Sequence, residues 1–300
     1  MAAVLSGVAA LVVALGGAAW QPQAPLPLPR TEVAAAPFRG DIAVVGGYLA
    51  DGDSTDDADL YDPASDTWSR LPDLPVGVNH AAAASAGGKL YIVGGYGGPG
   101  VRLRSAYVFD GERWRSLAPM PGVRGAAGAA AVAGRLYVVG GVGPDGLARR
   151  AFALNLKTGR WASIPGPTPR EHLAVTTAAG KVYAVAGRLA GIDTNLRAFE
   201  SYSPATKRWT KLVPVPDPRG GTGAAFTNGL IVSVGGEEPQ GTIGSVFGYN
   251  VATKRWRRLA DLPTPRHGVG VAAIAGRVYV IGGGTEPGLT VSGANESLVP

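Results

Sequence analysis

The sequence has no cysteine among its 300 residues, and this absence removes three kinds of chemistry. The chain cannot form disulfides, bind metals through thiolates or use a cysteine nucleophile. Histidine is also scarce, with only three residues, at positions 80, 172 and 267. Neither the GxSxG nor the HExxH pattern occurs, and no glycine-rich loop that would hold phosphate is present. We therefore expect no cofactor and no bound metal, and a binding role is favoured over a catalytic one.

Basic residues are absent before Arg30, although the chain opens with an apolar stretch over residues 4–15. Small residues follow this stretch up to Ala19, which is typical of a secretory signal with cleavage nearby, apart from the missing positive charge. An uncleaved anchor and a mis-assigned start codon stay open, and eighteen Ala- and Gly-rich residues are short for a membrane span. We expect residues 1–19 to be a signal peptide or N-terminal anchor, and the protein to be extracellular, periplasmic or in the cell envelope. Without a functional signal it would be cytoplasmic. Only residues 1–19, if uncleaved, would contact a membrane.

All six tryptophans fall on one period of about 47 residues. They are Trp20, Trp68, Trp114, Trp161, Trp209 and Trp256. Tryptophan is rare, so six residues in phase cannot result from composition alone. A fixed period of this size indicates a repeat protein, in which each repeat is one module stacked on its neighbours.

Each repeat contains a hairpin of two apolar strands. The second strand ends in a pair of small residues, in the segments 41–47, 89–95, 135–141, 181–187, 230–236 and 277–283. Only the fourth segment departs from Gly-Gly, with Ala186 before Gly187. A glycine precedes every pair by six residues, and Asn228-Gly229 is the dipeptide favoured in a two-residue hairpin turn. The pattern predicts a β-hairpin in every repeat.

A variable loop and two further short strands complete the repeat. The third strand carries Tyr61, Phe109, Leu154, Tyr202 or Tyr249 before a turn such as DPASDTW. The tryptophan opens the fourth strand, which stops at prolines. Four short antiparallel strands per repeat are the composition of a propeller blade.

These marks together resemble the kelch repeat: an apolar strand ending in Gly-Gly, a spaced tyrosine and a tryptophan seven residues later. The resemblance covers residues 20–300 and implies an all-β propeller, here of a bacterial, exported kelch protein. The sixth repeat has its Gly282-Gly283 pair and a third strand near residues 295–299, but no tryptophan follows. Trp20 has the right phase to supply the missing fourth strand. We therefore expect six blades, closed by the N-terminal strand joining the C-terminal blade, which protects the edges.

The net charge is +6 and the isoelectric point is about 9.6. Basic clusters beside the outer tryptophans are more typical of a solvated rim than of a nucleic-acid surface. We expect a monomer that does not bind nucleic acid. The mild positive charge favours acidic partners.

Five arginines share one phase, sixteen residues before the small-residue pair, and only Val78 breaks the pattern. They are Arg30, Arg124, Arg170, Arg219 and Arg266. One interpretation is a positive ring at the channel rim that would hold carboxylates. The other is a repeated structural role, in which each arginine packs between blades and binds loop carbonyls.

Two residues after the arginine phase, the residue type varies from repeat to repeat. The six residues are Glu32, His80, Ala126, His172, Gly221 and Gly268. Directly after the small-residue pairs stand Tyr48, Tyr96, Arg188 and Glu237. Because both positions belong to the same rim of the channel, we expect these side chains, with the phased arginines, to form a ligand-binding mouth. Structural histidines bonded to the backbone are the alternative for positions 80 and 172.

An acidic loop at residues 51–59 carries five aspartates, at positions 51, 53, 56, 57 and 59. Calcium prefers such oxygens, but the order of residues does not match the EF-hand pattern. Calcium binding here is the less favoured interpretation.

Two functions stay open. The first is a non-catalytic kelch module that recognises a protein, peptide or glycan at the channel rim, with acidic groups for the basic rim. The second is a sugar-active propeller that resembles the sialic-acid mutarotases or epimerases. In it Glu32, Glu171, His172 or Glu237 would exchange protons beside Arg170 or Arg188. Copper chemistry of the galactose-oxidase type is disfavoured because its cofactor needs a cysteine.

Overall fold

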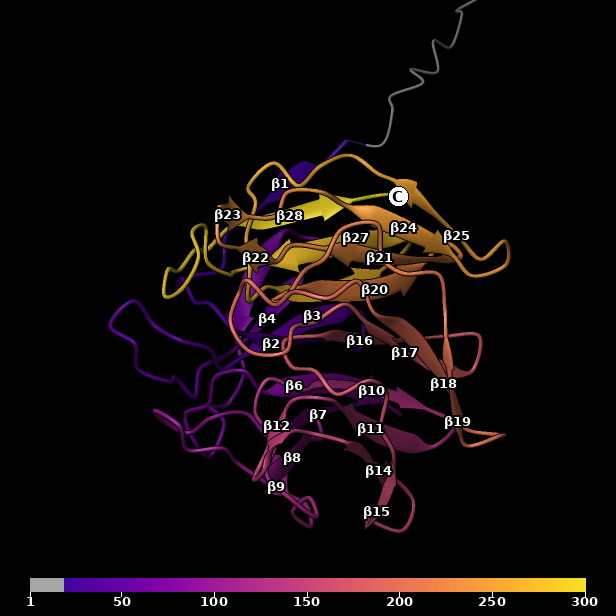
Figure 1. Cartoon of the computed structure of the whole chain (residues 1–300). Helices are drawn as coiled ribbons and strands as arrows, with labels where there is room; N and C mark the ends of the chain where they lie inside the picture. Colours follow the sequence, from indigo (N-terminus) through magenta and orange to yellow (C-terminus); the bar gives the residue numbers. More distant parts are fainter. Residues whose placement is uncertain (1–18) are drawn as a thin grey trace, which may run out of the picture.

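A computed structural model describes residues 19–300 of the chain, and all of the regular secondary structure in this range is β-strand (Figure 1). Six four-stranded antiparallel sheets form the blades. The first three contain β2–β5 (Ala34–Phe38, Asp41–Val45, Ala58–Asp62, Thr67–Arg70), β6–β9 (Ala82–Ala86, Lys89–Val93, Ala106–Phe109, Trp114–Ser116), and β10, β11, β14, β15 (Gly128–Val132, Arg135–Val139, Arg150–Asn155, Arg160–Pro165).

The remaining blades contain β16–β19 (Ala174–Ala178, Lys181–Val185, Phe199–Ser203, Arg208–Lys211), β20, β21, β24, β25 (Gly223–Thr227, Leu230–Val234, Phe247–Asn250, Arg255–Arg258), and β26, β27, β28, β1 (Gly270–Ile274, Arg277–Ile281, Asn295–Leu298, Gln21–Gln23). Two small hairpins decorate the loops of blades 3 and 5: β12–β13 (Val142–Gly143, Gly146–Leu147) and β22–β23 (Glu237–Glu238, Gly241–Thr242). The predicted six-bladed propeller with four antiparallel strands per blade is confirmed.

The ring closes as the sequence predicted. Strand β1 pairs with β28 in antiparallel register, with Gln21 opposite Ser297. Trp20 extends this closure, because its indole N–H donates a 2.9 Å hydrogen bond to the carbonyl of Ala260 in the preceding blade. Strand β28 therefore has a partner on both sides, which removes an edge that could template aggregation.

The innermost strands line the central channel, and their residues are small because six strands converge there. Consecutive inner strands contact one another all the way round the ring. Glycine faces valine between some neighbours: a Cβ on Gly128 would lie 2.4 Å from a methyl of Val175, and one on Gly223 would lie 2.1 Å from a methyl of Val271. The channel below the mouth encloses a cavity of about 130 Å³.

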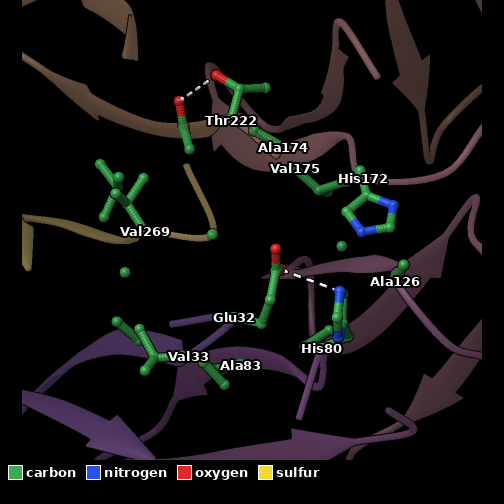
Figure 2. A pocket seen from close by; sticks show the side chains of 18 of the residues that line it. Glu32, Val33, His80, Ala83, Ala126, His172, Ala174, Val175, Thr222 and Val269 are labelled. Atoms are coloured by element: carbon green, nitrogen blue, oxygen red, sulfur yellow. Dashed lines mark hydrogen bonds and ion pairs between the residues drawn. The ribbon is translucent and has the colours of Figure 1, made fainter. Parts of the chain in front are cut away.

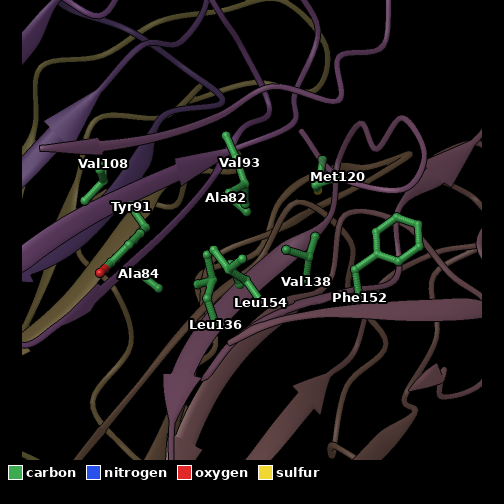
Figure 3. Packing of buried hydrophobic residues seen from close by; sticks show 12 residues of the cluster. Ala82, Ala84, Tyr91, Val93, Val108, Met120, Leu136, Val138, Phe152 and Leu154 are labelled. Carbon is green, nitrogen blue, oxygen red and sulfur yellow. The ribbon is translucent and has the colours of Figure 1, made fainter. Parts of the chain in front are cut away.

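The cores lie between adjacent blades. Between blades 2 and 3, Tyr91 and Val93 pack against Leu136, Val138 and the fully buried Met120 (Figure 3). At the rim of the blades, the tryptophan of each blade donates its indole N–H to a main-chain carbonyl of the preceding blade, over 2.7–2.9 Å. The tryptophan period therefore marks the connection from blade to blade.

Hairpin turns follow the expected chemistry. Asn228 and Gly229 both have positive φ, 49° and 76°, as a two-residue turn of the predicted kind requires. After the second strand of blade 1, Gly46 also has positive φ, and a Cβ there would lie 2.3 Å from the carbonyl oxygen of Val78. The small-residue pair thus permits the close approach of the next blade.

The proposed signal or anchor at residues 1–19 lies outside the described residues except for Ala19, so its role stays a prediction. Within residues 19–300, no helix is long and apolar enough to cross a membrane.

Candidate functional site

The channel mouth is built by a three-residue segment that precedes every inner strand. Its first residue is the buried arginine (Val78 in blade 2), and its second forms an isolated β-bridge with the residue after the small-residue pair. Thr31 bridges Tyr48, Asn79 bridges Tyr96, and the other four blades repeat this pairing. The third residue lines the channel cavity in all six blades. The predicted neighbourhood of the two loop positions is therefore present.

The third residues form a closed ring, here called the mouth ring, and all six have left-handed backbone. The φ angles are 52° at Glu32, 50° at His80, 51° at Ala126, 50° at His172, 68° at Gly221 and 59° at Gly268. Main-chain hydrogen bonds of 2.9–3.0 Å join four of the six consecutive pairs, for example from the N–H of His80 to the carbonyl of Glu32. The repeat thus imposes one backbone conformation on residues of very different chemistry.

The five phased arginines do not form a ring of free guanidinium groups. Arg30, Arg170, Arg219 and Arg266 are completely buried, and Arg124 is 5 % exposed. Arg170 donates to the carbonyls of Thr168, Ala184 and Ala186 and pairs with Glu200. The geometry is that of the structural alternative, in which the arginine fastens the mouth segment to its own blade.

The other four arginines vary this theme. Arg266 pairs with Glu296 at 2.6 Å, and Arg30 pairs with Asp59 at 2.8 Å. Within residues 19–300, Arg124 has no carboxylate partner and instead stacks over the ring of Phe152, 4.1 Å from its centre. Burial lowers the pKa of Arg219 to about 10, so its guanidinium still carries a charge at neutral pH.

A pit of about 160 Å³ opens at the mouth ring. Its lining includes Glu32, His80 and His172 from the ring, with other walls from Tyr48, Arg188, Glu237, His267 and Leu289. The structure therefore brings seven predicted rim residues to one place, because Tyr96 lies beside the pit with its ring 5.5 Å from that of His80. Tyr48 contacts the same imidazole at 5.6 Å.

Glu32, His80 and His172 line both the pit and the channel cavity below it, at the pit floor, and Figure 2 shows the carboxylate of Glu32 directed at the imidazole of the neighbouring His80. Nε2 of His80 is 3.3 Å from Oε2 of Glu32. The rings of His80 and His172 are perpendicular, with centres 4.8 Å apart. All three side chains are at most 13 % exposed. They come from blades 1, 2 and 4, so only the closed ring can assemble them.

The opposite wall of the pit holds the charged groups of blades 4, 5 and 6. Arg188 donates to Glu237 at 2.7 Å and lies 3.5 Å from Glu171. His267 is buried between two carboxylates, with Nε2 3.7 Å from Glu237 and 3.9 Å from Glu32. Arg188 is therefore neutralised by its neighbours.

Carboxylate groups outnumber guanidinium groups at the mouth. Burial lowers the pKa of His80 to about 4, although the nearby Glu32 opposes the shift, so the imidazole is neutral. Burial alone would raise the pKa of Glu32, but the three histidines and Arg188 together lower it to about 2. Three carboxylates, of Glu32, Glu171 and Glu237, thus stand against the single guanidinium of Arg188. Coulomb attraction in this partly dehydrated pit favours a cation.

His267 and Asn79 belong to the mouth but were not predicted, and Glu171 was named only in the sugar-enzyme alternative. Each is the second residue of its mouth segment, one position before the mouth ring. The same period would have located them, because this position is also occupied by different residue types in different repeats.

Two aspartates of the acidic loop form ion pairs with arginines of the same blade. Asp59 is buried against Arg30, and Asp57 pairs with the half-exposed Arg70. Asp51 accepts a hydrogen bond from the N–H of Asp53. Among residues 19–300, the one group of three histidine or acidic side chains with ligand atoms close enough to share a metal ion is Glu32, His80 and His172.

Comparison with known families agrees with this architecture. A family model described as the KLHDC2/KLHL20/DRC7 Kelch-repeats domain matches residues 32–216, and a Kelch motif model matches residues 218–263. The chain belongs to the kelch-repeat family. The resemblance inferred from the glycine, tyrosine and tryptophan spacing is therefore confirmed.

Several curated proteins are similar to this kelch propeller. The Kelch-like protein terF of Aspergillus terreus is 30 % identical over 234 residues, which is 76 % of this chain and 43 % of terF. The F-box/kelch-repeat protein SKIP30 of Arabidopsis thaliana is 38 % identical over 55 residues, or 18 % of this chain and 16 % of its own. The Kelch-like ECH-associated protein 1B of Danio rerio is 32 % identical over 87 residues, or 28 % of this chain and 15 % of its own. The kelch propeller thus spans less than half the length of these relatives.

Proposed function

We propose that this kelch propeller is a binding module that holds a protein or peptide against the loop face around the mouth pit. The observation that carries the proposal is a set of exposed apolar side chains on the loops of that face. Val101, Leu189 and Leu289 are 57 %, 46 % and 51 % exposed, and each belongs to a loop that follows a small-residue pair. Leu289 also lines the pit. Apolar contacts around a polar centre are typical of protein-binding surfaces.

The charged groups of the pit indicate which kind of ligand group would enter it. The sequence suggested an acidic partner, because the net charge is +6 and one interpretation of the phased arginines was a positive ring. Because those arginines are buried and the pit has an excess of carboxylates, the ligand group that enters the pit is expected to be positively charged or neutral. One similar protein is named for its association with a partner, ECH, which supports a partner-binding role by analogy only.

The sugar-enzyme alternative has less support from the same geometry. It needs an arginine free to hold a substrate carboxylate beside a proton-transfer group. Arg170 is buried outside the pit, and Arg188 is already paired with Glu237 at 2.7 Å. A carboxylate ligand would have to displace that pairing.

The test is a peptide-display library selected against the full chain. Affinities of the selected peptides are then measured for the parent, for a variant with Val101, Leu189 and Leu289 all changed to Ser, and for a control variant. The control changes Phe226 and Val213, which are 37 % and 54 % exposed but are not on loops that follow a small-residue pair, to Ser. Loss of apolar contacts should weaken binding at least about tenfold in the triple variant, because about 1.4 kcal/mol corresponds to a factor of ten. Equal affinity of the triple variant, or a loss confined to the control, would show that the loop face is not the binding surface.

A further inference from the structure

We propose that Glu32, His80 and His172 bind one divalent transition-metal ion at the floor of the mouth pit. Their candidate ligand atoms all lie within 4.8 Å of one another. The inference goes beyond the proposed function, because it assigns an ion to the pit whether or not a peptide binds the loops. Four independent features of the site support it.

The first feature is the orientation of the His80 imidazole. The side-chain amide of Asn79 donates to the carbonyl oxygen of Tyr96 at 3.3 Å and to the hydroxyl of Ser54 at 2.7 Å. Its oxygen therefore faces Nδ1 of His80, 2.5 Å away, and this nitrogen must carry the proton. In the neutral ring, Nε2 then presents its lone pair to the carboxylate of Glu32 at 3.3 Å. Two acceptors at this distance attract a cation between them.

The second feature is the set of partners around the two imidazoles. A metal-binding histidine usually gives its other ring nitrogen to an acceptor, which fixes the tautomer. Asn79 has this position beside His80. Next to His172, the carboxylate of Glu171 lies 3.4 Å from Nδ1, a buried nitrogen that makes no hydrogen bond within the described part of the chain. Both histidines thus have the surroundings of metal ligands.

The third feature is the backbone of the mouth ring. A φ near 50° disfavours residues with a Cβ, and blades 5 and 6 have glycine at this position. Glu32, His80 and His172 adopt the same φ in spite of this preference, and their side chains converge on one point. Ala126 has the same φ, so the backbone conformation belongs to the repeat. What distinguishes the other three positions is that side chains with ligand atoms project from this backbone to one place.

The fourth feature is the fit of donors and charge to a particular class of ion. Two imidazole nitrogens and one carboxylate suit zinc and its transition-metal neighbours, whereas calcium and magnesium prefer oxygen ligands. Ligand atoms of a tetrahedral zinc stand about 3.3 Å apart, given bonds of about 2.0 Å. The pair formed by His80 and Glu32 already has this separation. Three protein ligands leave one coordination position open towards the pit.

The alternative occupant of the gap is a proton, which would make His80 an imidazolium paired with Glu32. That arrangement uses only two of the three side chains and gives His172 no role. It also predicts a purely structural effect of substitution. The two accounts therefore differ in a measurable way.

The experiment uses the full chain, freed of metal with EDTA and then titrated with Zn²⁺ by calorimetry and with Co²⁺ by visible absorption. We expect one ion per chain and a Co²⁺ spectrum typical of low coordination number. Glu32→Gly, His80→Gly and His172→Gly should each weaken Zn²⁺ binding at least about 100-fold, beyond the 10–100-fold typical of a lost neighbour of a ligand. Ala126→Gly is the matched control, because it makes the same backbone change in the mouth ring without removing a ligand, and its affinity should be unchanged.

Melting temperatures in EDTA separate a metal site from a structural ion pair. Because glycine relieves the left-handed backbone, the three ligand variants should melt at or above the parent temperature, as Ala126→Gly should. If a glycine variant fails to fold, Glu32→Gln and His80→Gln repeat the binding measurement with the side-chain volume kept. A parent that binds no Zn²⁺, or ligand variants that bind as tightly as Ala126→Gly, would overturn the proposal. No peptide is present, so the outcome is independent of the proposed binding function.

Discussion

At the scale of single residues, the buried arginines determine how the mouth segments are held. Arg266 reaches the carbonyl oxygens of Thr264, Gly282 and Val280 at 2.8–3.0 Å and the carboxylate of Glu296 at 2.6 Å. One side chain thus bonds to the residues before the mouth segment, to the second strand and to the third strand of its blade. A buried charge with this many partners is tolerated because each partner replaces a bond to water.

Removal of such an arginine should be far more damaging than removal of an exposed one. Arg266→Ala leaves Glu296 and three carbonyls without their donor, so the free energy of unfolding should fall by about 3–5 kcal/mol. Arg258→Ala is the control, because Arg258 pairs with Asp261 at the surface, and its loss should change the value by at most about 1 kcal/mol. Urea unfolding measures both. Equal effects would show that the inner arginine is not structural.

The mouth histidine should make the fold sensitive to acid. The pKa of His80 falls from 6.5 to about 4 on folding, so the unfolded chain binds its proton first. Stability from this group is complete above pH 6.5 and is lost as the pH falls towards 4. The groups that face it are Glu32, His172, Arg188 and Glu171, and Glu32 stays ionised at pH 5 in both states.

Metal-free parent and His80→Gly should therefore differ in their response to pH. From pH 7 to pH 5 the parent should lose about 2 kcal/mol more of its unfolding free energy than the variant, from the linkage of about 1.4 kcal/mol per pKa unit. Denaturant titrations at the two pH values provide the measurement. A parent that loses no more than the variant would mean that His80 is not buried in the neutral form.

Residue-scale features were the hardest to predict from the sequence. The varying residues at positions 32, 80 and 172, together with Tyr48, Arg188 and Glu237, line one pit in the structure, and their role in ligand binding stays a prediction. The state of the arginines was not decided, because their acceptors are carbonyls of strands that lie 14 and 16 residues further on. The charge of the pit depends on that pairing, so its sign could not be read from composition.

At the scale of elements, the tryptophan of each outer strand connects neighbouring blades. Trp114 packs against Phe109, with the two ring centres 5.1 Å apart, and its indole N–H donates a 2.7 Å hydrogen bond to the carbonyl of Pro72 in blade 1. The tryptophan period could be seen in the sequence because this hydrogen bond recurs between every pair of adjacent blades and requires the same residue type each time. The loops after the small-residue pairs have no such constraint and no common sequence.

The inter-blade hydrogen bond has a testable value. Trp114→Phe keeps an aromatic ring beside Phe109 but removes the indole donor to Pro72. The free energy of unfolding should fall by about 1 kcal/mol, the usual net value of one hydrogen bond, with a little more for the smaller ring. Thermal and denaturant unfolding report the change. No measurable loss would show that the ring alone accounts for the tryptophan period.

At the scale of the whole molecule, closure of the ring gives the site its geometry. Glu32, His80 and His172 belong to three blades, and their relative positions depend on the pairing of β1 with β28 that completes the circle. The phase of Trp20 was enough to predict this closure. The sixth repeat lacks a fourth strand and the N-terminal segment carries an extra one, so the two pair with each other.

Loss of the closing strand should lower the stability of the whole propeller and expose a strand edge. A chain lacking residues 1–23 leaves β28 with an unpaired edge and removes the hydrogen bond from Trp20 to Ala260. Compared with a chain that begins at Ala19, it should melt at lower temperature and associate with rising concentration, as light scattering would show. Identical melting and scattering of the two chains would contradict closure by this strand.

The central claim is that a regular ring of six blades holds three irregular residues as one ion-binding site. Anomalous diffraction at the zinc absorption edge, from crystals grown with Zn²⁺, tests it most directly. The account predicts a single strong peak at the pit floor, within about 2.2 Å of one Glu32 oxygen and of one nitrogen each from His80 and His172. A mouth without such a peak, or a peak held by other residues, would contradict it.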